Sequence, residues 1–297
     1  MKIFATTEFH ERFLKPLSRV DPKIEIGEAK AERYKNGELH VLIASNVSDE
    51  NCIIVGSAAP PDEQLIRLCM FANALKNSGA KTVCAFLPYL GYGRQDKPKP
   101  NEAHGVELIG AMLKLAGIDK IVTFDVHSKL DESLIGLPLV SLSSAQIFVD
   151  EIKEFGWDEF VVVAPDEGAI ERAKSFAGLM SAPVVHFVKK RFDGVSQLEL
   201  VGNALPRAVI VDDIIDTGST LVSACDALRA KGVSEILVVA THGLFSSKIW
   251  EQAFVTGVVK IVTSDSTPQA VAQRHEQVKI TSLAPVVSGV IKEVGRL

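Results

Sequence analysis

Short runs of β-branched residues alternate with longer amphipathic segments along most of this 297-residue chain. The runs at 52–56 (CIIVG) and 82–87 (TVCAFL) have the composition of buried strands, and apolar residues at helical spacing lie between them. Asp62 precedes that helical segment as a candidate N-terminal cap, and Gly79 follows its end. Buried strands separated by helices predict an α/β fold with largely parallel sheets.

The same alternation continues through the second half, and a strand-loop-helix-strand pattern occurs once in each half. Duplicated α/β domains would produce this pattern, although two unrelated α/β domains would often share it. The boundary is expected near Leu142, at the stretch GLPLVSLSS, which predicts domains at 1–142 and 143–283. The remaining predicted elements are strands at 121–124, 160–164, 184–188, 208–211 and 236–240 and helices at 102–116, 168–176, 217–230 and about 284–294.

The composition excludes several classes of protein. A net charge of −5 argues against a general binder of nucleic acid or anionic membranes, because phosphate backbones favour basic surfaces. No run of about 18 or more apolar residues occurs, and the first residues lack the apolar core of a signal peptide. The four cysteines stand singly with no C-x-x-C pair, which indicates reduced thiols in a cytoplasmic protein.

The stretch 209–220 (VIVDDIIDTGST) combines an apolar strand, three aspartates and a helix start. The segment 216–220 therefore lies at the carboxyl end of a strand, where open α/β sheets bind ligands, and its N–H groups and hydroxyls suit a phosphate. A helix cap with a solvated turn would explain Asp216 but leaves Asp212 and Asp213 without a role. These two carboxylates place negative charge beside a segment that suits an anion, which a phosphate site alone does not explain.

A second polar segment, 88–97 (PYLGYGRQDK), directly follows the predicted strand at 82–87. Gly91 and Gly93 favour a tight turn, and Arg94 can bind phosphate with two parallel hydrogen bonds. No G-x-x-x-x-G-K-[ST] loop occurs anywhere in the chain, which excludes a P-loop kinase.

Three further places are ambiguous from their residues alone. The stretch 33–39 (RYKNGEL) is a polar turn in its simplest interpretation. His127 and Asp166 each follow a predicted strand, where either a ligand contact or a structural side chain fits. The segment 188–194 (VKKRFDG) suggests an exposed mobile loop or a solvated basic turn.

Two of these motifs resemble known ones. VIVDDIIDTGST resembles the phosphoribosyl diphosphate loop of type I phosphoribosyltransferases and of ribose-phosphate pyrophosphokinases. PYLGYGRQD resembles a signature of the pyrophosphokinases that the transferases lack, and the order and spacing of motifs agree over nearly the whole chain. The resemblance implies two similar type I phosphoribosyltransferase-like domains, each with a mainly parallel sheet flanked by helices, and a C-terminal helix at about 284–297 that joins the first domain.

The resemblance also implies a reaction, in which ATP and D-ribose 5-phosphate give AMP and 5-phosphoribosyl 1-diphosphate with Mg²⁺ as cofactor. Asn36 stands where the family has aspartate, and Lys190 stands where many relatives have arginine. The residues carried over are Lys189 and Arg191 for catalysis; Tyr34, Asn36, Gly37, Glu38, Arg94 and Gln95 for ATP; Arg191, Asp212, Asp213, Asp216, Thr217, Gly218, Ser219 and Thr220 for ribose 5-phosphate; and His127 and Asp166 for the metal, with Asp125 in support.

Self-association and two alternatives complete the expectations. In the family, the Arg94 and Asn36 segments reach ATP from a neighbouring subunit, which implies a homodimer at least and allows a hexamer. A phosphoribosyltransferase would consume the diphosphate, and it would not account for GYGRQD. A non-catalytic regulatory member would be expected to lose metal or loop residues, whereas His127, Asp166 and Lys189 are present here.

Overall fold

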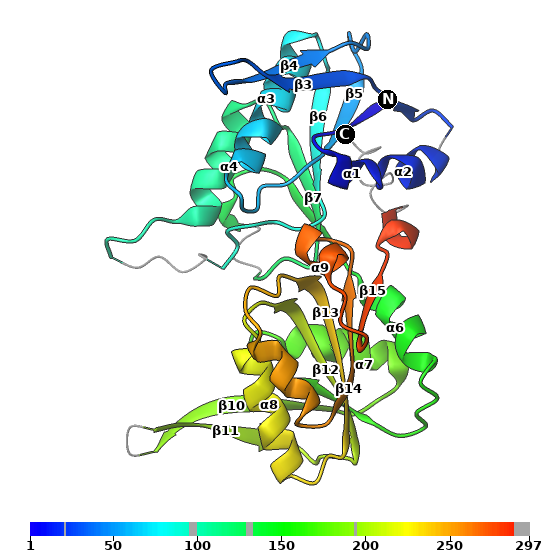
Figure 1. Ribbon diagram of the computed structural model, residues 1–297, viewed down its shortest axis with the longest axis vertical. Helices are drawn as coiled ribbons and strands as arrows, with labels where there is room; N and C mark the ends of the chain where they lie inside the picture. Colours follow the sequence, from blue (N-terminus) through cyan, green and yellow to red (C-terminus); the bar gives the residue numbers. More distant parts are fainter. Residues whose placement is uncertain (21, 95–99, 129–132, 193–194, 288–297) are drawn as a thin grey trace. The chain divides into compact units, whose positions relative to one another are not determined.

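The computed structural model describes residues 1–20, 22–94, 100–128, 133–192 and 195–287. These residues form two compact units, one of Met1–Leu142 with residues 284–287 and the other of Ser143–Leu283. Each unit contains its own mainly parallel sheet with helices packed against it (Figure 1), so the predicted α/β class is confirmed. None of the described helices has the length and apolar content that crossing a bilayer requires.

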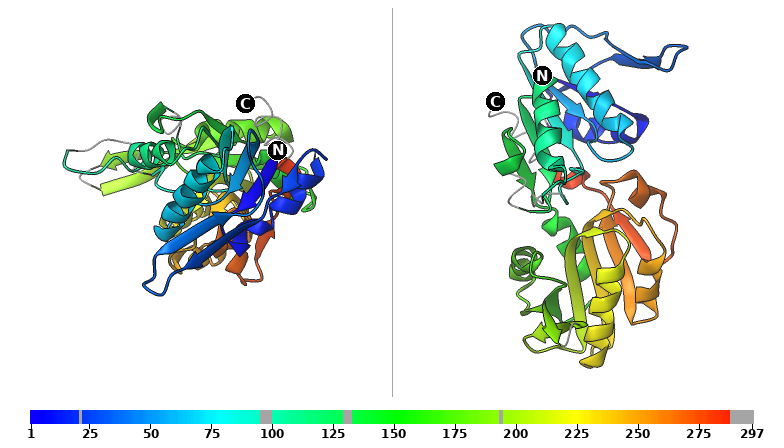
Figure 2. Two further views of the ribbon diagram at one scale, coloured as in Figure 1. Left: turned by 90° about the horizontal axis from the view of Figure 1, so that it is seen from above. Right: turned by 90° about the vertical axis from the view of Figure 1, so that its left-hand side faces the viewer.

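The sheet of the first unit has the order β2-β1-β5-β6-β7-β8, and the pairings between its described strands are all parallel. Strands β3 and β4 form a separate antiparallel hairpin, which Figure 2 shows reaching out from the other strands of this unit. The elements are β1 (Lys2–Ala5), α1 (Glu8–Glu11), α2 (Leu14–Val20), β2 (Glu25–Ile26), β3 (Ala29–Arg33), β4 (Leu39–Ile43), β5 (Asn51–Val55), α3 (Glu63–Asn77), β6 (Thr82–Leu87), α4 (Gly105–Leu115), β7 (Lys120–Phe124), β8 (Leu139–Leu142) and the 3₁₀ helix η2 (Ala284–Val286).

Both faces of this first sheet are covered (Figure 1). On one face, α3 and α4 bury Leu68 and Ile109 against the strands. On the other face, Phe13 between α1 and α2 packs edge-on against Phe86 of β6, with ring centroids 5.6 Å apart. A parallel sheet needs this double cover, which explains why its central strands are continuous apolar runs.

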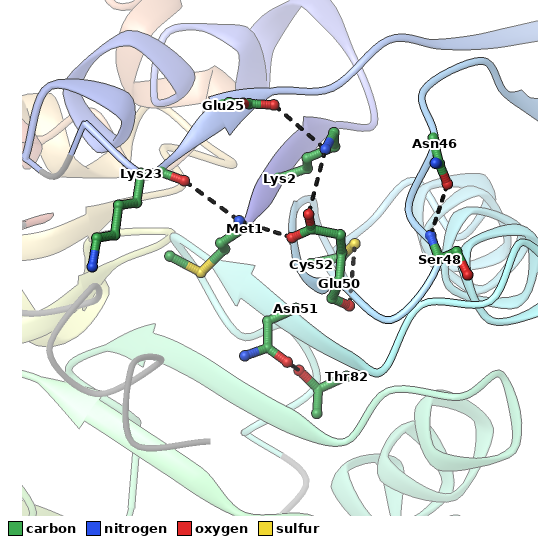
Figure 3. Close-up of polar contacts among 10 residues, drawn as sticks. All are labelled: Met1, Lys2, Lys23, Glu25, Asn46, Ser48, Glu50, Asn51, Cys52 and Thr82. Atoms are coloured by element: carbon green, nitrogen blue, oxygen red, sulfur yellow. Dashed lines mark hydrogen bonds and ion pairs between the residues drawn. The ribbon is translucent and has the colours of Figure 1, made fainter.

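Ion pairs hold the amino end of β1 between its neighbours (Figure 3). The ammonium group of Met1 lies 2.9 Å from Glu50 Oε2, and Lys2 Nζ lies 3.8 Å from Glu50 Oε1. The hydrogen bond from the ammonium group lowers the pKa of Glu50. One strand further along, Thr82 Oγ1 donates to Asn51 Oδ1 at 2.7 Å. These contacts lie at the amino edge of the sheet, opposite the edge that carries the sequence motifs.

The sheet of the second unit has the order β11-β10-β9-β12-β13-β14-β15, and among its described pairings only β10–β11 is antiparallel. Its elements are α6 (Ala145–Lys153), β9 (Val161–Ala164), α7 (Ile170–Met180), β10 (Val184–Phe192), β11 (Val195–Val201), β12 (Arg207–Ile215), α8 (Ser219–Ala230), β13 (Glu235–Gly243), the 3₁₀ helix η1 (Ile249–Phe254), β14 (Val258–Ser264), α9 (Pro268–Ala272) and β15 (Val278–Thr281).

Strands β10 and β12 extend further than the sequence predicts. The sequence predicts a loop at 188–194, but β10 continues to Phe192 and pairs with β11, and residues 193 and 194 lie outside the described part of the chain. This extension is stable because Leu198 and Leu200 of β11 pack against the apolar core of the unit. Strand β12 runs to Ile215, so its two adjacent aspartates lie inside the strand rather than after it.

Two details at helix ends also differ from expectation. Asp62 has a helical backbone, with φ −56° and ψ −23°, and makes no side-chain cap, so the predicted capping role is wrong. Its carboxylate instead accepts a hydrogen bond from Tyr92. The described part of the predicted C-terminal helix is the 3₁₀ turn η2, and residues 288–297 lie outside the described chain.

Candidate functional site

Acidic residues from two separate motifs lie side by side in the second unit. Strands β9 and β12 are parallel neighbours, with Val163 opposite Ile210. Continuing this register by three residues brings Asp166, which follows β9, near Asp213 in β12. Asp212 adjoins them, and its Oδ1 accepts the backbone N–H of Asp213 at 2.9 Å. The fold thus gathers three of the predicted carboxylates at one edge of the sheet.

This carboxylate cluster carries an electrostatic penalty. Burial raises the pKa of Asp212 well above its ordinary value, and the negative charges of Asp213 and Asp166 raise it further. Arg172 of α7 opposes this effect, since its Nη1 lies 3.7 Å from Asp212 Oδ1 and 3.6 Å from Asp213 Oδ1. The sequence did not mark Arg172 as a site residue. The cluster offers acceptor oxygens to hydroxyl groups or to a cation.

The loop between β12 and α8 has the geometry of an anion-binding turn. Gly218 has φ +90°, and a Cβ atom there would lie 2.4 Å from Trp250 Cα, so only glycine fits. The carbonyl of Thr217 accepts the Trp250 N–H at 3.1 Å, which fixes the turn. The hydroxyls of Thr217 and Ser219 lie 3.2 Å apart, and Thr220 is exposed. Together with the first N–H groups of α8, these hydroxyls can donate to a phosphate.

Two serines that the sequence did not single out brace this loop. Ser246 Oγ donates to the carboxylate of Asp216, and Ser247 Oγ donates to the carbonyl of Thr217 at 2.9 Å. Both serines follow β13, 30 residues beyond their partners. Because no local pattern relates residues at that separation, only the paired strands β12 and β13 reveal the connection.

The basic residues of β10 divide between the two sides of the hairpin. Lys189 is exposed and lies opposite Leu198, whereas Lys190 Nζ lies 2.5 Å from Glu199 Oε2. Successive side chains in a strand point to opposite faces, so the Lys190–Glu199 ion pair is on the side away from Lys189. Arg191 has a described backbone, opposite Ser196, but its side chain lies outside the described part of the structure.

In the first unit, the predicted ATP segment forms the turn between β3 and β4. Asn36 Oδ1 accepts the backbone N–H of Glu38 at 3.1 Å, which gives Asn36 a structural role in this turn. Gly37 has φ +91°, a conformation that favours glycine. Tyr34 is 55% exposed, and its ring centroid lies 5.2 Å from that of His40. The turn therefore presents an aromatic face and polar groups to solvent.

The start of α3 connects this turn to the GYGR segment. Arg33 Nη2 lies 2.8 Å from Glu63 Oε2, and the hydroxyl of Tyr92 donates to the neighbouring Asp62. Two motifs that are far apart in the sequence are thus attached to consecutive residues at the start of α3. Arg94 is described and exposed, whereas Gln95 lies outside the described residues.

The histidine proposed for the metal lies in the first unit. His127 follows β7 and is exposed, next to Val126, whose N–H donates to Ser141 Oγ at 3.2 Å. Asp125 has φ +35° and donates its N–H to the carbonyl of Leu142 at 3.0 Å, so the turn is anchored to β8. Within the described residues, no group of three or more His, Cys, Asp or Glu side chains is arranged to hold a metal ion.

Comparison with known proteins agrees with this arrangement of motifs. Residues 1–117 match a family model described as the N-terminal domain of ribose phosphate pyrophosphokinase, and residues 138–274 match one for the phosphoribosyl transferase domain. The chain is 32% identical to a ribose-phosphate pyrophosphokinase of Campylobacter jejuni over 303 residues, covering 99% of this chain and 95% of that one.

A second curated relative and a solved structure give the same result. A ribose-phosphate pyrophosphokinase of Fusobacterium nucleatum is 31% identical over 278 residues, covering 91% of this chain and 88% of that one. The crystal structure of phosphoribosylpyrophosphate synthetase from Mycobacterium smegmatis superposes with a TM-score of 0.86 at 27% identity, covering 99% and 98% of the two chains. The chain belongs to the ribose-phosphate pyrophosphokinase family.

Proposed function

We propose that this chain transfers the β,γ-diphosphoryl group of ATP to the C1 hydroxyl of D-ribose 5-phosphate, releasing AMP and 5-phosphoribosyl 1-diphosphate. One observation carries the proposal beyond family membership. The adjacent strands β10, β9 and β12 bring Lys189, Asp166, the two aspartates of β12 and the Gly218 turn to the same edge of one sheet. That edge supplies a cation for moving phosphates, acceptors for a sugar and donors for a terminal phosphate.

Each group has a distinct task in this proposal. The loop 216–220 holds the 5-phosphate through N–H groups and hydroxyls. Asp212 and Asp213 accept hydrogen bonds from the ribose hydroxyls and orient the C1 hydroxyl for in-line attack on the β-phosphorus. Lys189 and Arg191 offset the charge of the moving diphosphoryl group, because phosphoryl transfer depends mainly on positioning and charge neutralisation.

The nucleotide site belongs to the first unit in this proposal. Tyr34 offers a ring for adenine to stack on, and Arg94 with Gln95 binds the phosphates. Asn36 and Glu38 offer amide and carboxylate groups to the nucleotide from the same turn. By analogy with the family, these segments serve the active site of a neighbouring subunit, so we further propose that the protein is at least a homodimer. We also propose that it acts in the cytoplasm.

The carboxylate cluster fits Mg²⁺, the metal proposed here, by its chemistry. Mg²⁺ prefers oxygen ligands and commonly takes one or two carboxylates together with substrate phosphates. Asp166 and His127 are the proposed protein ligands, and the raised pKa of Asp212 indicates an edge where a cation would be favourable. When bound, Mg²⁺ would supply charge neutralisation at the phosphate oxygens.

The test is release of AMP from ATP, measured with and without ribose 5-phosphate and Mg²⁺. Release that requires both supports the proposed reaction. Consumption of 5-phosphoribosyl 1-diphosphate in the presence of a nucleobase, without release of AMP, would instead indicate a phosphoribosyltransferase. A folded protein with neither activity would be a regulatory member of the family.

A further inference from the structure

Arg172 is a charged side chain beside the proposed sugar site for which the proposed reaction has no task. It lies in the first turn of α7, six residues after Asp166 in the sequence. Its side chain is 19% exposed, and its Nη1 lies 3.7 Å from Asp212 Oδ1 and 3.6 Å from Asp213 Oδ1. These distances exceed those of direct hydrogen bonds, so the contact is a shared electrostatic one rather than a fixed bidentate pair.

The surroundings of Arg172 distinguish it from an ordinary surface cation. Lys174, two residues further along α7, pairs only 3.1 Å from Glu171, and both of those side chains are more than half exposed. Exposed pairs of that kind contribute little to stability. Arg172 instead faces two carboxylates of which one, Asp213, has a side chain only 7% exposed. A cation shared by this buried carboxylate and the partly buried one of Asp212 restrains both of them at once.

We propose that Arg172 is a positioning residue for ribose 5-phosphate, which acts by holding the carboxylates of Asp212 and Asp213 in place for the sugar hydroxyls. This inference rests on the proposed function. Adjacent carboxylates repel each other, and the repulsion is strong where water is excluded. With the guanidinium between them, both can keep the orientation that accepts from neighbouring hydroxyls. Without it, the Asp213 N–H still holds Asp212 Oδ1, but the repulsion between the two carboxylates is no longer offset, and the sugar meets less well ordered acceptors.

The consequence is confined to one substrate. Asp212 and Asp213 are proposed to contact ribose, whereas the proposed ATP residues Tyr34 and Arg94 belong to the first unit. Loss of Arg172 should therefore weaken binding of ribose 5-phosphate and leave the affinity for ATP unchanged. A purely structural role would lower the fraction of folded enzyme, which reduces kcat but moves neither KM.

The experiment compares Arg172→Met and Arg172→Lys with the matched control Lys174→Met on the same helix. Steady-state release of AMP gives kcat and the KM of each substrate, thermal unfolding gives the folded fraction, and calorimetry gives direct binding of ribose 5-phosphate. We expect Arg172→Met to raise the KM for ribose 5-phosphate about tenfold or more, with the KM for ATP within about twofold. Arg172→Lys should keep the KM for ribose 5-phosphate close to the wild-type value, and Lys174→Met should leave both KM values and kcat at wild-type levels.

Each outcome decides the inference. Equal changes in both KM values, or a fall in kcat alone, would overturn it. If Arg172→Met does not fold, Arg172→Gln takes its place, since it also removes the charge: a rise in the KM for ribose 5-phosphate alone supports the inference, and no change or equal changes overturn it. If the wild type releases no AMP, the proposed function fails separately, and calorimetry then decides, because equal binding of ribose 5-phosphate by the wild type and the folded Arg172 variant refutes the role.

Discussion

The two neighbouring lysines of β10 offer the sharpest test of the proposed chemistry. Lys189→Ala and Lys190→Ala remove the same charge from adjacent positions of one strand. The structure assigns them to opposite sides of the hairpin, with Lys190 engaged by Glu199 at 2.5 Å. Any general effect of losing positive charge would therefore be the same in both variants, and a difference between them reports the role of position.

The expected magnitudes differ widely. The side chains of Lys190 and Glu199 are 49% and 50% exposed, and exposed ion pairs contribute only about 0.2–1 kcal/mol, so Lys190→Ala should change kcat by less than about fivefold. Removing a group that stabilises charge in the transition state costs about 3–4 kcal/mol or more. At about 1.4 kcal/mol for each factor of ten, Lys189→Ala should lower kcat by at least about two to three orders of magnitude.

Initial rates of AMP release at saturating ATP, ribose 5-phosphate and Mg²⁺ measure this difference, with thermal unfolding as the control for folding. Both variants should unfold close to the wild-type temperature, because neither lysine is buried. Near-normal turnover of Lys189→Ala would refute the catalytic role of this residue. Equal losses in the two folded variants would refute the argument that the faces of the hairpin separate their roles.

Three further expectations concern the fold and its binding turns. Burial lowers the pKa of His10 from 6.5 to about 3, so below pH 6.5 the unfolded chain binds a proton that the folded chain excludes. The free energy of unfolding should therefore decrease as the pH falls from 6.5, by on the order of 5 kcal/mol at pH 3. Urea titrations from pH 7 to 4 should show this decrease in the wild type and not in His10→Gln. Gly218→Ala combines a positive φ with a contact at 2.4 Å to Trp250 and should weaken calorimetric binding of ribose 5-phosphate by about tenfold or more; unchanged binding would contradict the glycine requirement. Tyr92→Phe removes the hydrogen bond to Asp62 that anchors the segment leading to Arg94. If that bond contributes about 1 kcal/mol to holding the segment for ATP, the KM for ATP should rise about fivefold and the KM for ribose 5-phosphate should stay unchanged.

The elements that the sequence predicted well are those whose apolar residues are all buried. Strand β6 has the predicted bounds Thr82–Leu87, and β9 differs from its prediction by one residue. Burial of every side chain in a central parallel strand leaves a continuous apolar run, which a local reading detects. The α/β class followed from these runs and the helical segments between them.

The extensions of β10 and β12 could not be predicted because their polar residues are stabilised by distant partners. The sequence KKRF resembles a loop until Leu198 of β11 is known to lie opposite Lys189. In the same way, Asp212 and Asp213 would be expected to end a strand. Strand β13 nevertheless continues beside them, with Ala240 opposite Asp212. Pairing partners decide these strand ends, and no local pattern contains them.

In the site, too, residues within sequence motifs could be recognised, whereas residues that contact them from elsewhere in the chain could not. Residues of the acidic and glycine-containing motifs were recognisable as candidates because their types match ligand chemistry. Arg172 and Ser246 were not, because each has an ordinary local setting on a helix or a loop. Arg172 gains its significance from the adjacency of β9 and β12, and Ser246 from that of β12 and β13. Side chains that orient binding residues are specified by the fold. A motif search therefore finds the candidate binding residues and misses supporting residues such as Arg172 and Ser246.

The aspartates beside the proposed phosphate loop therefore fall into two groups with different surroundings. Asp212 and Asp213 lie within β12 and face Arg172, whereas Asp216 lies in the loop and accepts a hydrogen bond from Ser246. The carboxyl groups of the first two lie close together, and the raised pKa of Asp212 records the cost of placing charge there. Clustered carboxylates of this kind are typical of sites where they bind a ligand. Sugar hydroxyl groups and a divalent cation would both bind more tightly to such a cluster. Negative charge next to an anion loop is then no contradiction, because the strand carries the acceptors and the helix start carries the donors.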